Sequence, residues 1–472
     1  MKKLLITLLS LIPLVYSNDI KPNFIIIFTD DQGYGDLSCF NPQGVQTPHI
    51  DQMATEGMKF NNFYVSAAVC SASRAALLTG TYNDRIGIKS AFFPGTKQGL
   101  HPDEITIAEL LKEQNYATAC FGKWHLGDEP SLLPSAQGFD TYFGIPYSND
   151  MFIAPHQTFA ENAKFNGDWT LEKAKELQKF IAPHVNKRGP IWKSEYKALV
   201  PILEGEQIVE FPADQASLTQ RYFDRTIKFI DKNQNKPFFI FLTPAMPHVP
   251  LFASKEFRGK SKKGLYGDVI KEIDFHTGRL IKHLKEKELD QNTLVIFTSD
   301  NGPWLSYGDE GGSSGPLRDG KFTSYEGGVR MPTVFWGPGL IKANSVCNQL
   351  ASTIDLLPTF AQLVNTQVPQ DRKIDGKDIS PLLKSQNHVI HRHLFFRDEA
   401  VRSGDWKLVV KEHHMTMRKG PLPALYNLKN DVAESNNLID THPKVAQYLQ
   451  SKLDEHLKDL NENSRPMADL NE

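Results

Sequence analysis

The 472-residue sequence contains few cysteines, little excess charge, and no repeat or low-complexity tract. Its four cysteines, Cys39, Cys70, Cys120 and Cys347, are too irregularly spaced for a disulfide scaffold or a zinc-finger pattern. The formal net charge is −2, which gives no reason to expect binding to nucleic acid or to an anionic membrane surface. An anion bound by this protein must therefore be held by a local group of cations.

The sequence also lacks an apolar run long enough for a comfortable membrane span. The first 17 residues have Lys2 and Lys3 at the start, a short apolar run over 4–15, and the small residue Ser17 at the end. This pattern predicts an export signal over residues 1–17. No cysteine follows the run, so a lipoprotein anchor is not expected. We expect a periplasmic or secreted protein that is not embedded in a membrane, and the sequence does not indicate its oligomeric state.

Apolar β-branched segments alternate with amphipathic helical segments through most of the chain. Strands are predicted at 24–28, 116–121, 237–242 and 293–297, and helices at 47–58, 104–114, 218–233 and 265–288. Continuous apolar strands are typical of a parallel sheet that is covered by helices on both faces. After about residue 370, three shorter strands with polar breaks (HLFFRDE, WKLVVKE and ALYNLKND) precede a closing helix. We predict an α/β domain over 18–370 and a smaller C-terminal α+β subdomain over 371–472.

A short helix is predicted to begin near Cys70 and to end at Gly80. Ser71 and Ser73 are suitable caps for its free N–H groups, and the alanines and leucines that follow are good helix formers. A thiol at the positive end of a helix, one turn before Arg74, is placed where an anion is favoured and where a thiol's pKa is lowered. For this segment alone, a buried structural cysteine is the simpler interpretation.

Polar side chains follow each of the four predicted buried strands. The four strand ends carry Asp30 and Asp31, Lys123 and His125, His248, and Asp300 and Asn301. In open α/β sheets, ligands bind beyond the carboxyl ends of the strands, so these side chains are expected along one rim. An acidic turn or a lone histidine is usually structural, but four such strand ends together indicate a site.

The candidate residues divide by their chemistry. One group consists of the oxygen donors Asp30, Asp31, Asp300 and Asn301. Such donors suit a hard divalent cation, Ca²⁺ or Mg²⁺, better than they suit zinc. A second group consists of the fixed cations Arg74, Lys123 and Lys321, which beside a metal would clamp a multiply charged oxyanion. The third group, His125 and His248, can transfer protons near neutral pH, and Cys70 is a candidate nucleophile or its precursor.

Eight motifs, in order along nearly the whole chain, resemble those of the type I sulfatases of the alkaline-phosphatase superfamily. They are IIIFTDDQGYGDLS, CSASRAALLTG, NYATACFGKWHLG, GFDTYFGIPYSND, PAMPHVP, TSDNG, GKFTSYEGGVRMP and SGDWKLV. The similarity is to the arylsulfatase A and N-acetylgalactosamine-6-sulfatase branch. It implies an alkaline-phosphatase-like three-layer α/β/α sandwich with a smaller C-terminal α+β subdomain (an antiparallel sheet plus helix), and hydrolysis of a sulfate monoester.

The resemblance implies that Cys70 is converted to formylglycine (3-oxoalanine), whose hydrate has two hydroxyls on one carbon. One hydroxyl would attack sulfur and form a sulfuryl-enzyme intermediate, and loss of the other's proton would then expel sulfate. The family motif commonly has proline where this chain has Ala72. Alanine there is typical of bacterial sulfatases matured by a radical-type enzyme. We therefore expect a radical-type maturase as a partner and a bacterial origin.

The resemblance also implies a role for each candidate residue. The metal, Ca²⁺ or possibly Mg²⁺, would be held by Asp30, Asp31, Asp300, Asn301 and modified Cys70. Lys123 and Lys321 would bind sulfate oxygens, Arg74 would steady the formylglycine, and Ser148 would contact substrate. His125 would be the base that drives collapse of the intermediate, and His248 the acid that protonates the leaving alcohol.

Two other functions are compatible with the same sheet. A phosphatase or phosphodiesterase of the same superfamily would need a second set of Asp and His ligands if it used two metals, and no second set is evident. A non-enzymatic glycan-binding protein would result if Cys70 stayed a thiol.

The substrate is predicted only as a class, a sulfated polysaccharide or oligosaccharide such as an algal galactan or ulvan, a glycosaminoglycan or a mucin. Recognition of the sugar is expected from an irregular insertion over 151–215, with one helix and loops, and from C-terminal loops. His156, Trp192 and Arg402 are candidate sugar contacts, although a structural or solvent-exposed role is the simpler expectation for each. The branch favours exo action.

Overall fold

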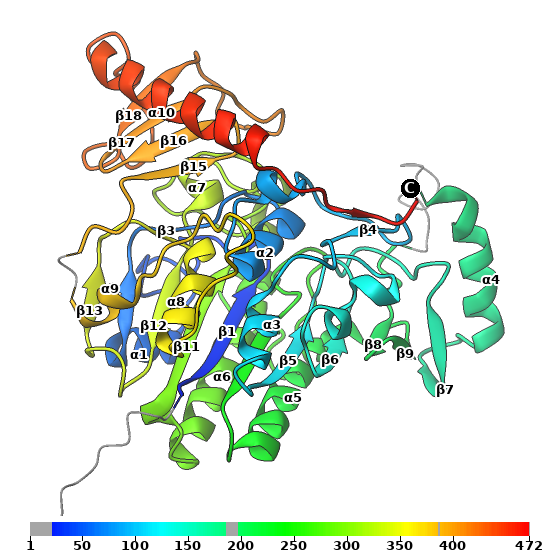
Figure 1. Ribbon diagram of the computed structural model, residues 1–472. Helices are drawn as coiled ribbons and strands as arrows, with labels where there is room; N and C mark the ends of the chain where they lie inside the picture. Colours follow the sequence, from blue (N-terminus) through cyan, green and yellow to red (C-terminus); the bar gives the residue numbers. More distant parts are fainter. Residues whose placement is uncertain (1–20, 186–196, 386–387, 472) are drawn as a thin grey trace, which may run out of the picture.

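The chain folds around one large central sheet with helices on both faces, and a smaller sheet lies at one end (Figure 1). The computed structural model describes residues 21–185, 197–385 and 388–471. Within these residues the central sheet has eleven strands. In order across the sheet they are β13 (Ser345–Cys347), β2 (Met58–Phe60), β12 (Thr333–Trp336), β11 (Thr293–Ser299), β1 (Asn23–Thr29), β10 (Phe238–Thr243), β5 (Ala117–Gly122), β6 (Thr141–Gly144), β8 (Ile202–Glu204), β9 (Gln207–Phe211) and β7 (Thr158–Phe165).

The four strands predicted from sequence are neighbours at the centre of this sheet. Strand β1 pairs in parallel with β11 on one side and β10 on the other, and β10 pairs in parallel with β5. Ile25, for example, lies opposite Ile240 and Val295. Because the strands are parallel and adjacent, their carboxyl ends meet at one rim, as predicted.

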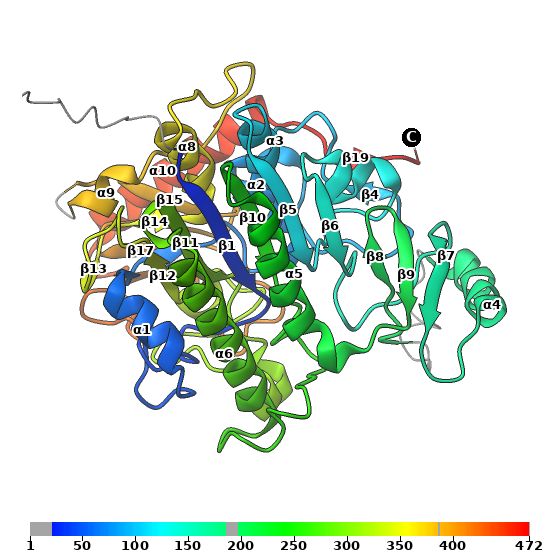
Figure 2. The same cartoon turned by 90° about the horizontal axis from the view of Figure 1, so that it is seen from below.

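Alternate side chains of β1 serve two separate cores. Phe24 and Ile26 pack with one helical layer, whereas Ile25 and Ile27 pack with the other. This two-sided burial confirms the three-layer α/β/α arrangement and explains why the strand is continuously apolar. The first layer contains α2 (Cys70–Thr79), α3 (Ile107–Lys112) and α8 (Leu356–Leu363), and the second contains α1 (Pro48–Glu56), α5 (Leu218–Asn233) and α6 (Gly264–Glu286) (Figure 2).

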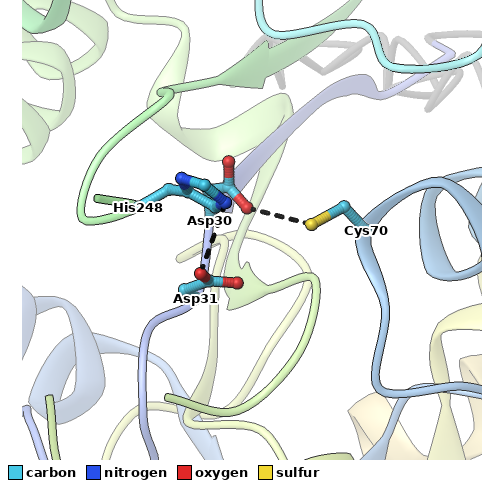
Figure 3. A group of neighbouring side chains, drawn as sticks. All are labelled: Asp30, Asp31, Cys70 and His248. Atoms are coloured by element: carbon cyan, nitrogen blue, oxygen red, sulfur yellow. Dashed lines mark hydrogen bonds and ion pairs between the residues drawn. The ribbon is translucent and has the colours of Figure 1, made fainter. Parts of the chain in front are cut away.

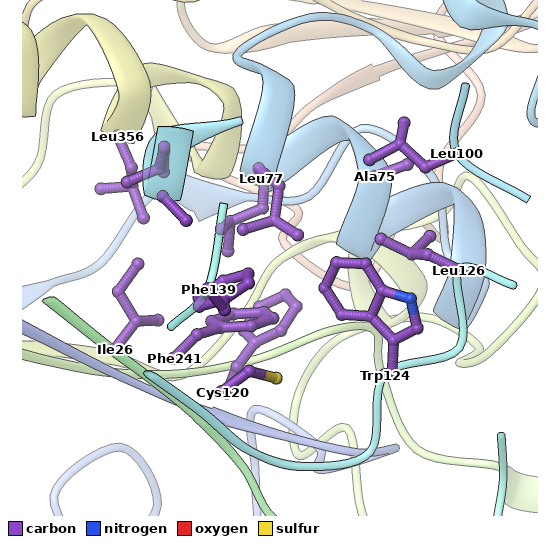
Figure 4. Packing of buried hydrophobic residues seen from close by; sticks show 14 of the residues in the cluster. Ile26, Ala75, Leu77, Leu100, Cys120, Trp124, Leu126, Phe139, Phe241 and Leu356 are labelled. Carbon is purple, nitrogen blue, oxygen red and sulfur yellow. The ribbon is translucent and has the colours of Figure 1, made fainter. Parts of the chain in front are cut away.

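The core beneath helix α2 is closely packed. Figure 4 shows Leu77 of α2 beside Phe139 and Phe241, with Trp124 next to them. The rings of Trp124 and Phe139 meet edge to face with centroids 6.0 Å apart. Each fully buried large apolar side chain of this kind contributes about 1.5–3 kcal/mol to stability. This packing fixes the position of α2 and therefore of Cys70 at its start.

The C-terminal part forms a four-stranded antiparallel sheet with a long helix on it, which confirms the predicted α+β subdomain. Three of its strands were predicted, and β16 was not. The boundary at 370/371 stays a prediction. The elements are β15 (His393–Phe396), β16 (Ala400–Ser403), β17 (Trp406–Val409), β18 (Ala424–Asn427) and α10 (Pro443–Glu462). Shorter elements are α7 (Glu326–Val329), α9 (Ser380–Lys384) and the strand pairs β14 (Ala351–Ser352) with β3 (Phe63–Tyr64) and β19 (Ala468–Asp469) with β4 (Gln98–Gly99).

The insertion over 151–215 is more regular than predicted. It contains the expected helix, α4 (Leu171–Ile181), but also β7, β8 and β9, which extend the central sheet beyond β6. Strand β7 is mostly solvent-accessible and rich in polar residues, so its sequence carries no buried-strand pattern. Only its pairing with β9 places it in the sheet.

The predicted export signal over 1–17 lies outside the described residues. Within the described residues, none of the helices has both the length and the apolar character needed to cross a membrane.

Candidate active site

Cys70 is the first residue of helix α2, and its side chain is buried at the rim of the sheet. Gly80 ends the helix in the left-handed conformation, with φ of 65°, as predicted. The predicted caps are wrong, because neither serine caps the helix. Ser71 Oγ instead accepts a hydrogen bond from the backbone N–H of Phe92 at 3.1 Å. Ser73 Oγ is buried and has no hydrogen-bond partner among the described residues.

The Cys70 thiol does not behave as its helix position suggested. Burial raises its pKa far above the usual range, and the nearby cations Lys123 and Lys321 do not offset this effect. Removal of the thiolate from water therefore outweighs the attraction of these cations. Cys70 Sγ lies 3.5 Å from Asp30 Oδ1. As a plain thiol, Cys70 is a poor nucleophile at neutral pH.

The predicted oxygen donors meet at the ends of β1 and β11. Asn301 Nδ2 donates a hydrogen bond to Asp31 Oδ1 at 2.7 Å. Asn301 Oδ1 is buried and has no hydrogen-bond partner among the described residues. Figure 3 shows Asp30 and Asp31 facing Cys70 and His248, and one ligand atom from each of these four lies within 4.8 Å of the others.

Each acidic group is matched by a buried cation. Three pairs form, Lys123 with Asp30, Lys321 with Asp31 at 2.7 Å, and Arg74 with Asp300 at 2.8 Å. All six side chains are almost fully buried. Their formal charges cancel, so a divalent cation and an anionic ligand would together leave the buried site close to neutral.

The carboxylates differ in their proton affinity. Burial raises the pKa of Asp30, but Lys123 and its other cationic neighbours outweigh this and hold the pKa well below its usual range. Burial and the charge of Asp30 raise the pKa of Asp300 to about 7, despite its pair with Arg74. A carboxylate that is hard to ionise beside another carboxylate indicates that a further positive charge would be favourable there.

His125 is held in a strained conformation with one free ring nitrogen. Its φ is 63°, and its Nε2 lies 3.1 Å from the carbonyl oxygen of Phe92. Nδ1 is buried and has no hydrogen-bond partner among the described residues. Burial, with Lys123 and Arg74, lowers its pKa well below the usual range, so the ring is neutral at pH 7. A neutral ring with an unused nitrogen can accept a proton.

His248 lies on the other side of the acidic group. Its Nε2 is 3.2 Å from Ser148 Oγ and 3.6 Å from Asp31 Oδ2, and its Nδ1 is 2.6 Å from the carbonyl oxygen of Val249. Burial and Lys321 lower the pKa of His248. The carbonyl fixes Nδ1 as a donor, so Nε2 is the atom that faces a ligand.

The site opens into a cavity of about 700 Å³. The predicted residues that line it are Cys70, His125, Ser148, His248 and Lys321. Sequence reasoning missed the rest of the lining, including Phe93, Asp150, Trp304, Phe322, Arg397 and His413. Trp304 had a signal, because it follows the TSDNG motif by two residues. The residues from the C-terminal subdomain had none.

Two of the candidate sugar contacts, His156 and Arg402, are not among the residues that line this cavity. His156 Nε2 lies 2.9 Å from the carbonyl oxygen of Asp128. Arg402 is buried and pairs with Glu326 at 3.3 Å. Both residues therefore have partners within the fold, in agreement with the structural role that was the simpler expectation for them. Trp192 lies outside the described residues.

All four cysteines are unpaired in the structure. Cys120 and Cys347 are buried within the core, and Cys39 is partly exposed. No disulfide joins these four cysteines, a question that their spacing in the sequence had left open.

Comparison with known proteins gives a consistent result. The family profile described as "Sulfatase" matches residues 22–366, and "N-sulphoglucosamine sulphohydrolase, C-terminal" matches residues 318–463. Arylsulfatase A of Bos taurus is 36% identical over 464 residues, covering 90% of this chain and 85% of that protein. N-acetylgalactosamine-6-sulfatase of Homo sapiens is 36% identical over 390 residues, covering 79% and 68% respectively.

Solved structures agree. The PsFucS1 sulfatase from Pseudoalteromonas sp. superposes with a TM-score of 0.77 at 26% identity, covering 95% of this chain and 92% of that chain. Ps i-CgsB, solved in complex with k-i-k-neocarrahexaose, gives a TM-score of 0.75 at 28% identity and covers 95% of each chain.

Proposed function

Because this chain belongs to the sulfatase family, whose members are sulfuric ester hydrolases, we propose that it hydrolyses a sulfate ester of a glycan at the Cys70 pocket. The observation that carries the proposal is the convergence at one rim of the sheet. Cys70, three buried cations and the oxygen donors meet beside a cavity of about 700 Å³. Fixed cations around a candidate nucleophile suit a reaction at a negatively charged ester.

The oxygen donors fit a hard divalent cation. Their donor atoms are carboxylate and amide oxygens, which Ca²⁺ and Mg²⁺ prefer, and Asn301 Oδ1 is left without a partner in a buried position. We propose that Ca²⁺, or Mg²⁺, is held by Asp30, Asp31, Asp300 and Asn301 together with matured Cys70. When bound, the cation supplies stabilisation of negative charge on the ester oxygens.

We propose that Cys70 acts after conversion to formylglycine, since burial makes its thiol a poor nucleophile. The hydrated aldehyde supplies a hydroxyl nucleophile that the thiol does not. Arg74, with Nη1 donating to the carbonyl oxygen of Lys123 at 3.0 Å, is fixed one helical turn away and steadies this group. Lys123 and Lys321 are placed to bind the sulfate oxygens.

The two histidines divide the proton transfers. His125 is neutral, with an unused Nδ1, and is assigned the role of base. His248 is assigned the role of acid, with Nε2 directed towards Ser148, which would contact the substrate. Since burial lowers the pKa of His248, its proton would be acquired as the anionic ester binds, because a nearby negative charge raises the pKa of a histidine.

The substrate is proposed as a class. Relatives are named for an N-acetylgalactosamine sulfate, and one structural neighbour was solved with k-i-k-neocarrahexaose. These names support a sulfated polysaccharide or oligosaccharide, from algal galactans or ulvans to glycosaminoglycans or mucins. Export through residues 1–17 and maturation by a radical-type enzyme, suggested by Ala72, complete the proposal.

A phosphatase of the same superfamily is the second candidate function. Within the described residues, one cluster of acidic, histidine and cysteine side chains has its ligand atoms close enough to share a metal ion, the one at Asp30 and Asp31. A two-metal phosphatase would need another set beside it. The single cluster therefore favours the sulfatase.

The test is release of inorganic sulfate by protein co-expressed with a radical-type maturase. We expect 4-nitrophenyl sulfate to be hydrolysed much faster than 4-nitrophenyl phosphate, and peptide mass spectrometry to find an aldehyde at Cys70. Cys70→Ala should abolish turnover with the fold intact, whereas Cys39→Ala, which changes a cysteine outside the pocket, should not. Full activity with an unmodified thiol, or activity in Cys70→Ala, would refute the assignment.

A further inference from the structure

The cavity has a second set of cationic side chains that the proposed chemistry does not use. Lys89 reaches it from the segment after helix α2, and Arg397 reaches it from the turn between β15 and β16. We propose that Arg397, supported by Lys89, binds a second anionic group of the substrate, either a carboxylate or a further sulfate. The inference rests on the proposed function and narrows its substrate to a glycan with at least two negative groups.

Among the described residues, the Arg397 guanidinium makes few contacts within the fold, which leaves it able to bind a ligand. Its Nε is buried and has no hydrogen-bond partner among the described residues. Its Nη1 lies 4.0 Å from Glu399, at the outer limit of an ion pair, and Glu399 already accepts a hydrogen bond from Ser324 at 2.5 Å. A guanidinium has five N–H donors in a planar fork that matches a carboxylate or sulfate. Arg397 therefore has donors to spare at the cavity wall.

The backbone of Arg397 is also held in an unfavourable conformation. Its φ is 55°, in the left-handed region that few non-glycine residues adopt. Three other residues at this site share the feature, namely Asp31, His125 and Phe322. Strain of this kind persists where the surrounding structure requires it, and it is concentrated at functional sites. The tight turn directs Arg397 into the cavity alongside residues that carry the chemistry.

Among the described residues, the acidic side chains nearest to Lys89 and Arg397 are not part of the cavity lining. Burial raises the pKa of Asp84, while Arg397 and Lys89 close to it both lower this pKa, and Glu399 lies 4.0 Å from Arg397. Asp398, next in the turn, pairs with Lys411. Among the cavity-lining residues that the structure describes, Asp150 is the one carboxylate. The wall around Arg397 therefore presents positive charge to a ligand.

An aromatic surface joins the two cationic sets. The Lys321 ammonium lies 4.3 Å from the centroid of the Trp304 ring, and the Phe322 ring stacks on His413 with centroids 5.6 Å apart. Arg397 and His413 are close enough to interact electrostatically. The apolar face of a sugar ring can pack on these rings while its charged groups reach both sets.

Direct binding to a protein that cannot turn over tests the inference apart from the proposed reaction. In the Cys70→Ala background with Ca²⁺, calorimetry would compare three probes: N-acetylgalactosamine 6-sulfate, its 4,6-disulfate, and the uronate-linked disaccharide of the 6-sulfate. We expect the second anionic group to tighten binding at least tenfold, and Arg397→Gln to remove that gain while changing affinity for the monosulfate less than twofold. Lys458→Gln, which removes an exposed cation of helix α10 in the same subdomain, should change nothing.

The outcomes separate the sources of the second charge. A gain from the disulfate alone assigns a sulfate to Arg397, and a gain from the uronate alone assigns a carboxylate. The inference is overturned if neither probe binds more tightly than the monosulfate, or if Arg397→Gln weakens all three probes equally. 4-Nitrophenyl sulfate carries one negative group. Its hydrolysis by the matured enzyme therefore tests the proposed function independently of Arg397.

Discussion

A buried amide oxygen without a partner is costly, and Asn301 has one at the centre of the acidic group. Its Nδ2 donates to Asp31, so the side chain is fixed with Oδ1 directed elsewhere. Around it, buried carboxylates are balanced by buried cations, and burial together with Asp30 raises the pKa of Asp300 to about 7. Each feature is explained if a divalent cation binds here.

Asn301→Ala should therefore weaken Ca²⁺ binding by roughly tenfold or more, because it removes one oxygen from a small ligand set. Isothermal titration of the metal-stripped protein measures this directly. Asn436→Ala, at an exposed position of the C-terminal part, is the matched control and should bind Ca²⁺ like the wild type. Unchanged Ca²⁺ affinity in Asn301→Ala would remove this residue from the proposed metal site.

Helix α1 is capped by a residue from another helix. Its own N-cap, Thr47, makes no capping hydrogen bond to it, whereas Asp274 of α6 accepts from the backbone N–H of Ile50 at 2.8 Å and of His49 at 3.4 Å. Burial raises the pKa of Asp274 to about 7, even though these hydrogen bonds favour its charged form. The contact joins two helices of one layer through a buried carboxylate.

This carboxylate should make stability depend on pH. An aspartate has a pKa of about 3.9 in the unfolded chain, so between about pH 4 and pH 7 the folded protein binds more protons at Asp274 than the unfolded chain does. Its contribution is therefore greatest below about pH 4 and falls as the pH rises to 7. Asp274→Asn should flatten the change in urea midpoint between pH 5 and pH 7.5. Asp454→Asn, at an exposed position, should leave the change in urea midpoint as it is in the wild type. An equal change in both variants would contradict the raised pKa of Asp274.

At the scale of the whole molecule, the C-terminal subdomain is tied to the catalytic part by a buried ionic group. Lys407 of β17 pairs with Glu326 of α7 at 2.9 Å and with Glu434 at 3.0 Å, and all three side chains are fully buried. Glu326 lies five residues after Lys321 in the chain. The subdomain therefore helps to hold the segment that carries Lys321, which we propose binds sulfate, in addition to supplying part of the cavity wall.

Lys407→Met should lower the free energy of unfolding by about 3–5 kcal/mol, because it leaves the buried Glu434 without its cation and removes one of the cations at Glu326. Chemical denaturation followed by circular dichroism measures the change. Lys458→Met, on the exposed face of α10, removes a surface pair at 3.8 Å and should change stability by less than about 0.5 kcal/mol. Equal stabilities of the two variants would show that the buried group does not hold the subdomain.

The centre of the fold could be predicted because its pattern is local. Phe24 to Phe28 form a continuous apolar run, which is typical of a strand that is covered on both faces. Asp30 and Asp31 follow this run after one residue. Sequence also placed the oxygen donors and Lys123 on one rim, since parallel neighbours end together. The caps of α2 could not be predicted, because Ser71 is recruited by the distant backbone of Phe92.

The sequence by itself determined the family and the three-layer architecture and predicted the candidate residues of the site, because motifs and strand periodicity are properties of short segments. Only the tertiary structure decided that polar strands such as β7 extend the sheet, that the Cys70 thiol has a raised pKa, and that Arg397 reaches the cavity. These features depend on burial and on pairing between segments hundreds of residues apart. Desolvation and long-range contact leave no signal in local sequence, so they become visible only when the chain is folded.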